Sequence, residues 1–300
     1  MEKSKSISWV VSDAFWSILM HTAPTKLYLS LKYRVIFGKW IDWNNPQSFT
    51  EKMQWLKVYG FKPEYVLMVD KVLVKEYVAE KIGKEYIIPT LTFADDVEDL
   101  DTNALPTKFV LKTNHDSGTA IVCKDKCSFD FTESKKALKQ ALKHNYYLMG
   151  RELPYKYVKR RVFAEEFIES GTDEEIKDYK FFCFNGEPRL FKINFDRSTA
   201  FSANYYDTEM NLMPFGEVWP APDYSKTCTK IQNFDKMLEI CRKLSKGIPF
   251  VRVDLYNING KIYFGELTFY PTSGFGPFTD KEWDLKLGSW ITLPKKNYHA

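Results

Sequence analysis

Two carboxylates stand in an otherwise apolar stretch near the end of the chain. The segment VRVDLYNINGKIYFGELTFYPTSG, residues 251–274, is typical of a strand, a tight turn and a second strand. Asp254 lies on the first strand and Glu266 on the second. Carboxylate oxygens are the ligands that hard divalent ions prefer, whereas unpaired carboxylates among apolar side chains cost free energy. The hairpin therefore either supports a metal ion or pairs its acids with cations.

The length of the turn decides whether the two acids share a face of the hairpin. Side chains alternate faces along a strand. A two-residue loop at residues 259–260 puts Asp254 and Glu266 on opposite faces. A three-residue loop at residues 258–260, with Gly260 in the left-handed conformation, puts them on the same face. The sequence is compatible with either loop.

The three-residue loop makes a specific set of cross-strand pairs. In that register Asp254 faces Phe264, and Arg252 faces Glu266. The two acids are then diagonal neighbours, about 7–8 Å apart at the backbone, a spacing at which they can hold a hard divalent ion. The alternative is an Arg252–Glu266 salt bridge with Asp254 at the surface, since ion pairs on sheets are common. The hairpin alone leaves both interpretations open.

A polar loop earlier in the chain has the composition of an anion-binding loop. Lys112 ends the apolar run FVL and is followed by TNHDSGT. The loop ends in Ser117, Gly118 and Thr119. Glycine lets backbone N–H groups approach an anion, and the hydroxyls add hydrogen-bond donors. We therefore expect Lys112 and this loop to contact phosphate groups.

Two more lysines add positive charge. Lys71 follows Asp70 at a helix start, and Lys180 lies inside the apolar run DYKFFCF, where an unpaired ammonium is unfavourable. Three lysines and Arg252 can neutralise a triphosphate while the acids hold Mg²⁺. For any single lysine the alternative is a solvated surface cation.

The segment FAEEFIES has the pattern of a strand whose end can read a nucleobase. Backbone N–H and C=O groups at such an end can pair with the edge of adenine. Glu165 can accept a hydrogen bond from the exocyclic amine. An ordinary exposed glutamate at a strand end is the alternative.

Composition excludes several other classes of protein. The chain has 300 residues, 44% of them apolar and 16% aromatic, which is enough for a large core and argues against disorder. A net charge of +4, spread along the chain, is too weak to predict nucleic-acid binding. Five irregularly spaced cysteines indicate free thiols in a reducing compartment and no zinc site. No Walker-type phosphate loop and no G-x-G-x-x-G motif is present.

The N-terminal stretch MEKSKSISWVVSDAFWSILMHTAPTK has a basic start and an apolar middle. Asp13 interrupts the apolar run, no small-residue cleavage site follows, and the run is too short to span a bilayer. We expect an amphipathic helix that packs on the protein. A helix lying on a membrane surface is the alternative.

The remaining patterns predict an α+β protein with antiparallel sheets, because strands and hairpins outnumber alternating strand–helix units. Ser48 or Thr50 can cap a helix in the N-terminal region. Further helices are expected at about residues 65–82, 132–144 and 233–246. Strands are expected around residues 109–111 and 120–122, with a second hairpin turning at Asn185-Gly186.

Taken together, these segments resemble the ATP-grasp superfamily, whose relatives include the D-alanine–D-alanine ligases. They look most like the TupA-like branch associated with capsule and teichuronopeptide genes. The resemblance is carried from about Phe49 onward by DKVLVKEYVAEKIGKEYIIPTL, LPTKFVLKTNHDSG, DYKFFCFNGEP and VRVDLYNINGKIYFGELTFYPTSGFGPF. It implies two α+β lobes with antiparallel sheets that clasp ATP. The implied division is an N-terminal helical extension at residues 1–58, the N-terminal and central lobes at 59–164, and a C-terminal lobe with the metal-binding hairpin at 165–300.

The resemblance also implies roles for individual residues. Those that would bind ATP are Lys71, Lys112, Ser117, Gly118, Thr119, Glu165, the hinge residues Glu166, Phe167 and Ile168, and Asp178 near the ribose. Those that would act in catalysis are Lys180 and Arg252, and those that would hold Mg²⁺ are Asp254, Glu266 and Thr268. Thr268 stands where the family usually has Asn, and a hydroxyl ligates Mg²⁺ more weakly than an amide carbonyl. His115 is expected to fill its loop, and a part in substrate handling is the alternative.

The implied activity is ATP-dependent carboxylate–amine ligation through an acyl phosphate, with ATP and Mg²⁺ as cofactors. The implied substrates are a carboxylate-bearing sugar or sugar nucleotide and an amine donor, with no nucleic acid. The implied location is the cytoplasm, peripheral to membrane-bound polysaccharide machinery at the inner membrane face. A glycosyltransferase is the first alternative, because Asp99 and Asp101 form an Asp-x-Asp motif that can bind a metal and a sugar nucleotide. A non-catalytic nucleotide-binding scaffold is the second.

Overall fold

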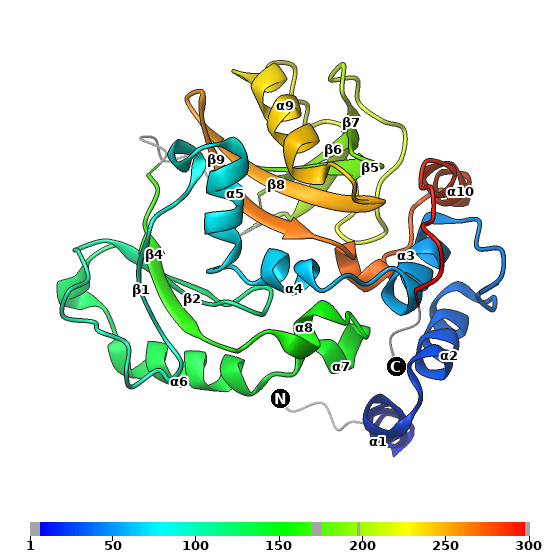
Figure 1. Ribbon diagram of the computed structural model, residues 1–300, viewed down its shortest axis with the longest axis horizontal. Coiled ribbons are helices and arrows are strands. Elements are labelled where there is room, and N and C mark those ends of the chain that lie inside the picture. Colours follow the sequence, from blue (N-terminus) through cyan, green and yellow to red (C-terminus); the bar gives the residue numbers. More distant parts are fainter. Residues whose placement is uncertain (1–6, 170–175, 197–198, 298–300) are drawn as a thin grey trace.

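The protein is built on two antiparallel sheets, as the α+β prediction requires. The computed structural model describes residues 7–169, 176–196 and 199–297 (Figure 1). Within these residues one sheet has four strands in the order β1-β4-β2-β3, and the other has five in the order β7-β6-β5-β8-β9. Every pairing in both sheets is antiparallel.

The four-stranded sheet carries both nucleotide-binding segments expected from the sequence, the strand with Lys112 and the strand with Glu165. Its strands are β1 (Thr90–Ala94), β2 (Phe109–Thr113), β3 (Ala120–Cys123) and β4 (Val162–Glu166). Apolar side chains such as Phe109 and Leu111 pack against Leu138 of helix α6 (Phe131–Lys143). Asp130 caps this helix by accepting a hydrogen bond from the Glu133 N–H at 2.9 Å. The strands predicted at 109–111 and 120–122 and the helix at 132–144 are confirmed.

The five-stranded sheet carries the hairpin with the two acids. Its strands are β5 (Asp178–Phe184), β6 (Glu187–Phe195), β7 (Ser202–Asp207), β8 (Phe250–Ile258) and β9 (Lys261–Thr268). Asn185 and Gly186 have positive φ angles of 51° and 91°, so the predicted two-residue turn is confirmed. Helix α9 (Phe234–Ser245) covers one face, where Phe234 contacts Phe181 and Phe191 (Figure 1). The opposite face carries the charged side chains of Lys180 and Asp254 together with apolar ones such as Phe182, which contacts Tyr205 and Phe250.

The N-terminal region is helical, as predicted. It comprises α1 (Ile7–Thr22), α2 (Thr25–Phe37) and α3 (Phe49–Tyr59). Ser48 is the cap of α3: its hydroxyl accepts from the Glu51 N–H at 3.3 Å, and the Glu51 carboxylate accepts from the Ser48 N–H at 3.2 Å. Helix α3 packs against α10 (Lys281–Ser289). No helix in the described part of the chain is both long and apolar enough to cross a membrane.

The single helix expected over residues 65–82 is wrong, because the chain forms two helices there. They are α4 (Glu64–Val69) and α5 (Val74–Ile82). Asp70 separates them: one carboxylate oxygen accepts from the N–H groups of Val72 and Leu73 at 2.9 and 3.2 Å. Its other oxygen accepts from the Asn114 side chain at 2.7 Å. A carboxylate that binds backbone N–H groups starts a new helix rather than continuing the old one.

Two short helices, α7 (Tyr146–Gly150) and α8 (Pro154–Tyr157), precede β4 and lie near α4. The chain then passes through β4, which spans the lobe boundary predicted between residues 164 and 165. The change from one sheet to the other comes after β4 and before β5.

Candidate functional site

A cavity of about 510 Å³ has walls from both sheets and collects most of the residues singled out in the sequence. Of these, the following line it: Lys71, Lys112, Ser117, Gly118, Thr119, Glu165, Asp178, Lys180, Arg252, Asp254, Glu266 and Thr268. The expected hinge residues Glu166, Phe167 and Ile168 are not among the lining residues. The Glu166 N–H is already bonded to the Pro89 carbonyl at 3.0 Å. The residues that line the cavity thus come from segments that are far apart in the sequence.

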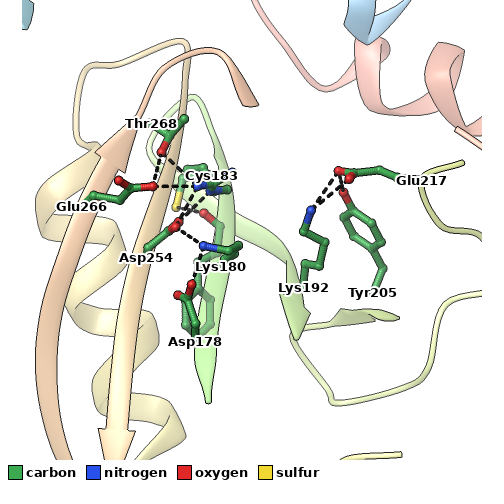
Figure 2. Close-up of polar contacts among 11 residues, drawn as sticks. Asp178, Lys180, Cys183, Lys192, Tyr205, Glu217, Asp254, Glu266 and Thr268 are labelled. Carbon is green, nitrogen blue, oxygen red and sulfur yellow. Dashed lines mark hydrogen bonds and ion pairs between the residues drawn. The ribbon is translucent and has the colours of Figure 1, made fainter. Parts of the chain in front are cut away.

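Charged side chains form a continuous row across the five-stranded sheet. Lys180 on β5 lies opposite Asp254 on β8, and Asp254 lies opposite Glu266 on β9. In the other direction Lys180 lies opposite Lys192 on β6, which lies opposite Tyr205 on β7. Directly opposite residues point to the same face of a sheet. One row thus joins all five strands on the face away from α9 (Figure 2).

The β8–β9 hairpin combines the shorter turn with a shared face for the acids. Ile258 pairs with Lys261, so the loop has two residues, Asn259 and Gly260, with φ angles of 53° and 87°. Such a loop by itself would put the acids on opposite faces. Of the two loops with which the sequence is compatible, the structure has the two-residue one, and the register built on the three-residue loop does not form.

A β-bulge restores the common face. Leu255 pairs with Phe264, whereas Asp254 pairs with Glu266, so Gly265 is an extra residue on β9. One extra residue reverses the facing of every side chain beyond it. A side chain at Gly265 would bring a Cβ atom within 3.0 Å of the Asp254 carbonyl oxygen. The expected pairing of Asp254 with Phe264 is wrong, and the acids are direct rather than diagonal neighbours.

Arg252 binds both acids. It lies opposite Thr268, so the expected register of Arg252 opposite Glu266 is also wrong. Its guanidinium nonetheless donates to both Asp254 oxygens at 2.6 and 2.7 Å, to Glu266 at 2.9 Å and to the Thr268 hydroxyl at 3.0 Å. Asp254 is only 2% exposed, which contradicts the interpretation that placed it at the surface. Lys180 also bridges Asp254 and Asp178.

These contacts keep the cluster ionised. Burial raises the pKa of Asp254, but Arg252 and Lys180 outweigh burial and lower it to about 2. Burial lowers the pKa of Arg252, but the carboxylates of Asp254 and Glu266 hold it above its ordinary value. At neutral pH the face therefore carries fixed charges of both signs.

The oxygen donors of this cluster fit Mg²⁺ if a phosphate supplies the remaining ligands. Asp254 and Glu266 are adjacent, the Thr268 hydroxyl is 3.1 Å from Glu266, and all three line the cavity. Within the described residues, no group of three or more His, Cys, Asp or Glu side chains could hold a metal. Mg²⁺ is commonly bound through one or two carboxylates and substrate phosphates. Arg252 competes for the same oxygens, so metal binding would require it to release some of them.

The opposite wall of the cavity centres on Glu165. This side chain is 5% exposed and forms ion pairs with Lys75, at 3.0 Å, and with Lys112. Burial raises the pKa of Glu165, but the two lysines outweigh burial and hold it below its ordinary value. Sequence reasoning missed Lys75, although it lies four residues after Lys71 and the same spacing repeats on a helix surface. The helix break at Asp70 places Lys71 before α5 and Lys75 within it.

The loop after β2 is open towards the cavity. Gly118 has a φ angle of 102°, and a Cβ atom added there would meet nothing within 4 Å. Thr119 donates to Asp116, and the Lys71 ammonium donates to the Asp116 carbonyl. His115 is buried outside the cavity lining, with its ring 3.2 Å from the His144 carbonyl.

Two further sets of side chains show where the sequence analysis and the site differ. Lys192 lies 3.0 Å from both oxygens of Glu217, which also accepts from the Tyr205 hydroxyl at 2.7 Å (Figure 2). This buried trio extends the charged row, and sequence reasoning missed it because Glu217 lies in a loop without a motif. Asp99 and Asp101 are exposed and do not line the cavity.

Solved structures with some similarity to this chain include two D-alanine–D-alanine ligases and an ATP-grasp ligase. D-alanine–D-alanine ligase from Bacillus anthracis, complexed with ATP, is similar at 14% identity and a TM-score of 0.40, over 68% of this chain and 54% of that one. D-alanine–D-alanine ligase from Helicobacter pylori is similar at 16% identity and a TM-score of 0.43, over 84% of this chain and 68% of that one. The ATP-grasp ligase PsnB, complexed with its minimal precursor, is similar at 9% identity and a TM-score of 0.40, over 69% of this chain and 53% of that one. The chain thus spans about half the length of the first and third of these proteins.

No curated protein matches the sequence. A family model does match it: the model of the TupA-like ATPgrasp family aligns with residues 51–292. The match covers the acidic hairpin, both lysine-bearing walls of the cavity and the two sheets between which the cavity lies. Because it extends over most of the chain, this protein belongs to the TupA-like ATP-grasp family.

Proposed function

We propose that this chain is an ATP-dependent carboxylate–amine ligase that forms an amide through an acyl phosphate. The observation that carries the proposal is the meeting of cations in one cavity: Lys71, Lys75 and Lys112, from the segment around the start of α5 and from β2, on one side, and Lys180 and Arg252, from the five-stranded sheet, on the other. This is the charge pattern that a triphosphate needs. Family membership agrees with it.

The chemistry begins with activation of a carboxylate. A carboxylate oxygen attacks the γ-phosphorus of ATP, ADP leaves, and the acyl phosphate forms. The lysines would hold the phosphates in line and offset their negative charge. Mg²⁺, held by Asp254, Glu266 and Thr268, would supply Lewis-acid stabilisation of the transferred phosphoryl group.

The second step forms the amide. The amine nitrogen attacks the acyl carbon, the C–N bond forms, and the C–O bond to phosphate breaks with the electron pair leaving on phosphate. Arg252 is positioned to stabilise the oxyanion that develops on the acyl oxygen. Its release from Asp254 and Glu266 when phosphate and metal bind would free its guanidinium for this task.

The remaining assignments belong to the same proposal. We assign the adenine to the end of the cavity near Glu165, with backbone contacts from residues 166–168 and the ribose near Asp178. Because Lys75 and Lys112 already bind Glu165, the exocyclic amine would compete with a lysine for that carboxylate. We retain the division into residues 1–58, 59–164 and 165–300.

For the substrates, we propose a uronic acid or related sugar carboxylate of surface polysaccharide and an amine donor. Trp40, Trp219 and Tyr224 are exposed, and none of them lines the cavity, so sugar stacking would have to occur at its mouth or beyond it. We propose a cytoplasmic location at the inner face of the membrane. The exposed apolar side chains of α1 and α2 support a peripheral association.

The test supplies ATP and Mg²⁺ with D-glucuronic acid, D-galacturonic acid or UDP-glucuronic acid, each with L-glutamate, L-lysine or ethanolamine. We expect ADP and phosphate in equal amounts, with an amide detected by mass spectrometry. If the protein binds ATP but none of the substrate pairs leads to ADP formation, the protein is a nucleotide-binding scaffold. Cleavage of a sugar nucleotide without ATP would indicate a glycosyltransferase, which no structural observation favours, since Asp99 and Asp101 lie outside the cavity.

A further inference from the structure

One wall of the cavity is built from residues that have no role in the predictions made from the sequence. Glu152, Tyr146 and Tyr155 come from the region of α7 and α8, and Thr272 and Ser273 come from the 3-10 turn after β9 (Pro271–Gly274). Glu152 is only 3% exposed, yet it lines the cavity. A carboxylate in such a place needs a reason, because burying a charge is costly unless it is paired.

The wall is held in place by helix α3. Gln54 donates to the Gly274 carbonyl at 2.8 Å, and Lys57 donates to the Ser273 carbonyl at 2.6 Å. Lys57 also donates to the Gln54 side chain at 2.9 Å. The Ser273 hydroxyl in turn donates to Glu152. Gln54 and Lys57 are both at most 1% exposed, so the orientation of Glu152 depends on a buried network that spans more than half of the chain.

The turn that carries Ser273 is strained. Thr272, Ser273 and Gly274 have consecutive left-handed φ angles of 50°, 52° and 63°. A side chain on Gly274 would put its Cβ atom 2.5 Å from the Met53 Cβ atom. Non-glycine residues held in this region cost free energy and cluster at ligand-binding sites. The strained backbone of this turn thus places the Ser273 hydroxyl against Glu152.

The wall lies beside the proposed reaction centre. The rings of Tyr146 and Tyr155 contact each other at 4.8 Å between centroids. Burial raises the pKa of Tyr155, and the charges of both Glu152 and Glu266 raise it further. The same two carboxylates, after burial, raise the pKa of Tyr146 to about 12. Both tyrosines therefore lie within electrostatic reach of the acidic hairpin on one side and of Glu152 on the other.

We propose that Glu152 binds the ammonium group of the amine substrate and accepts its proton, with Ser273 orienting the carboxylate and the two tyrosines forming the sides of the subsite. This inference rests on the proposed ligase function. It assigns the amine to this wall because Glu152 would repel the carboxylate substrate, whose acyl phosphate belongs next to Arg252. One N–H proton passes to Glu152, and the freed electron pair attacks the acyl carbon. The second N–H proton leaves with the departing phosphate as the C–O bond to phosphate breaks.

The charges around Glu152 are consistent with this exchange. The titratable groups that face it are Lys57 on α3, Lys32 on α2, Tyr146, Tyr155 and Tyr270. Burial raises the pKa of Glu152, which prepares it to take up a proton. Burial lowers the pKa of Lys57 to about 7, although the negative charge of Glu152 acts to raise it. Lys57 can therefore lose its proton when an ammonium arrives, so the number of buried charges stays constant.

The experiment compares two nucleophiles on the same activated carboxylate. Wild type and Glu152→Gln are given ATP, Mg²⁺ and D-glucuronate, with either hydroxylamine, which is neutral near pH 7, or ethanolamine, which is protonated. We expect the ratio of amide to hydroxamate at pH 7 to fall about 100-fold in Glu152→Gln. The ratio should recover by about tenfold for each pH unit towards the pKa of the free amine, because solution then deprotonates the nucleophile.

Three controls separate the outcomes. Glu209→Gln, on an exposed turn after β7, should behave as wild type. Ser273→Ala should lower the ratio in the same direction, and affinity for a non-hydrolysable ATP analogue should be the same in Glu152→Gln and wild type. An unchanged ratio in Glu152→Gln, a ratio that does not respond to pH, or wild-type hydroxamate without any amide would overturn the assignment of Glu152. Absence of both products and of ADP in wild type would instead overturn the proposed function itself.

Discussion

Asp254 and Glu266 lie directly opposite each other across β8 and β9, and a single guanidinium, that of Arg252, binds them both. The acids share a face because Gly265 is an extra residue between two stretches of regular pairing. Arg252 thus pairs with the buried carboxylate of Asp254, which Lys180 also contacts, and with the partly exposed carboxylate of Glu266. A metal–phosphate complex would have to replace that cation, which couples nucleotide binding to the release of Arg252.

Neutralising either acid should abolish turnover. Asp254→Asn and Glu266→Gln each remove a proposed metal ligand, and we expect ADP release to fall at least about 100-fold. Asp254→Asn should also destabilise the fold by roughly 2 kcal/mol, because Arg252 and Lys180 each lose one carboxylate partner, while Glu266 and Asp178 still pair with them. The side chain of Glu266 is 34% exposed, so the free energy of unfolding of Glu266→Gln should be close to that of wild type. Near-normal ADP release by both variants would exclude the metal assignment.

The bulge at Gly265 should be required for activity. Deleting Gly265 would give β9 a regular register with the two-residue turn and would move Glu266 to the other face. We expect loss of ADP formation, while Lys71, Lys75 and Lys112 continue to bind the nucleotide weakly. Lys261→Ala, at the exposed start of β9, is the matched control. An active deletion variant would show that the common face of the two acids is dispensable.

Lys75 should contribute to nucleotide affinity, although no sequence motif marks it. Lys75→Met leaves Glu165 with Lys112 as its only lysine partner, and we expect the Kd for ATP to rise about 5- to 100-fold. Lys75→Arg should retain most of the affinity because it keeps the charge. Isothermal titration with a non-hydrolysable analogue measures the effect, and Lys139→Met on exposed α6 serves as the comparison. Equal affinities for Lys75→Met and wild type would remove Lys75 from the site.

Stability should fall when acid protonates Asp254. Its folded-state pKa of about 2 lies below the ordinary value of 3.8, so its ionised form favours the folded state. The contribution, roughly 2 kcal/mol, is present above pH 4 and is lost as the pH falls towards 2. Glu165, whose pKa is also lowered, contributes with the same sign. Urea unfolding between pH 7 and pH 3 measures this, and Asp254→Asn should show a flatter decline; an identical decline would contradict the prediction.

The N-terminal helices should bind anionic membranes. Phe15, Ile18 and Val35 are 54%, 62% and 68% exposed, and the segment from Phe15 to Trp40 contains four basic and no acidic residues. Exposed apolar side chains and cations together favour binding to anionic lipid. We expect co-sedimentation with vesicles of phosphatidylglycerol and phosphatidylcholine, reduced by Val35→Glu. Val122→Glu, at an exposed apolar residue of β3, should not reduce it. Wild type that stays in the supernatant would refute the prediction.

Local signals in the sequence were sufficient for much of the fold. Asn185-Gly186 and Asn259-Gly260 both form the two-residue turns that such pairs favour, and Ser48 with Glu51 caps α3. Lys71, Lys112, Asp254 and Glu266 could be named because their positions match a family pattern, whereas Lys75 and Glu152, which line the same cavity, could not. Asp70, however, divides an apparently continuous helix, because its carboxylate binds backbone N–H groups and a side chain 44 residues away.

The sequence by itself determined which strands, turns and helices form, and it supplied the charged residues of the site. Only the tertiary structure decided which of these charges meet, because register and bulges depend on pairing along the whole strand and not on the turn alone. Gly265 sets the facing of Glu266, and Lys75 reaches Glu165 from 90 residues away. Ser273 and Glu152 are 121 residues apart, and a buried network is what brings them together.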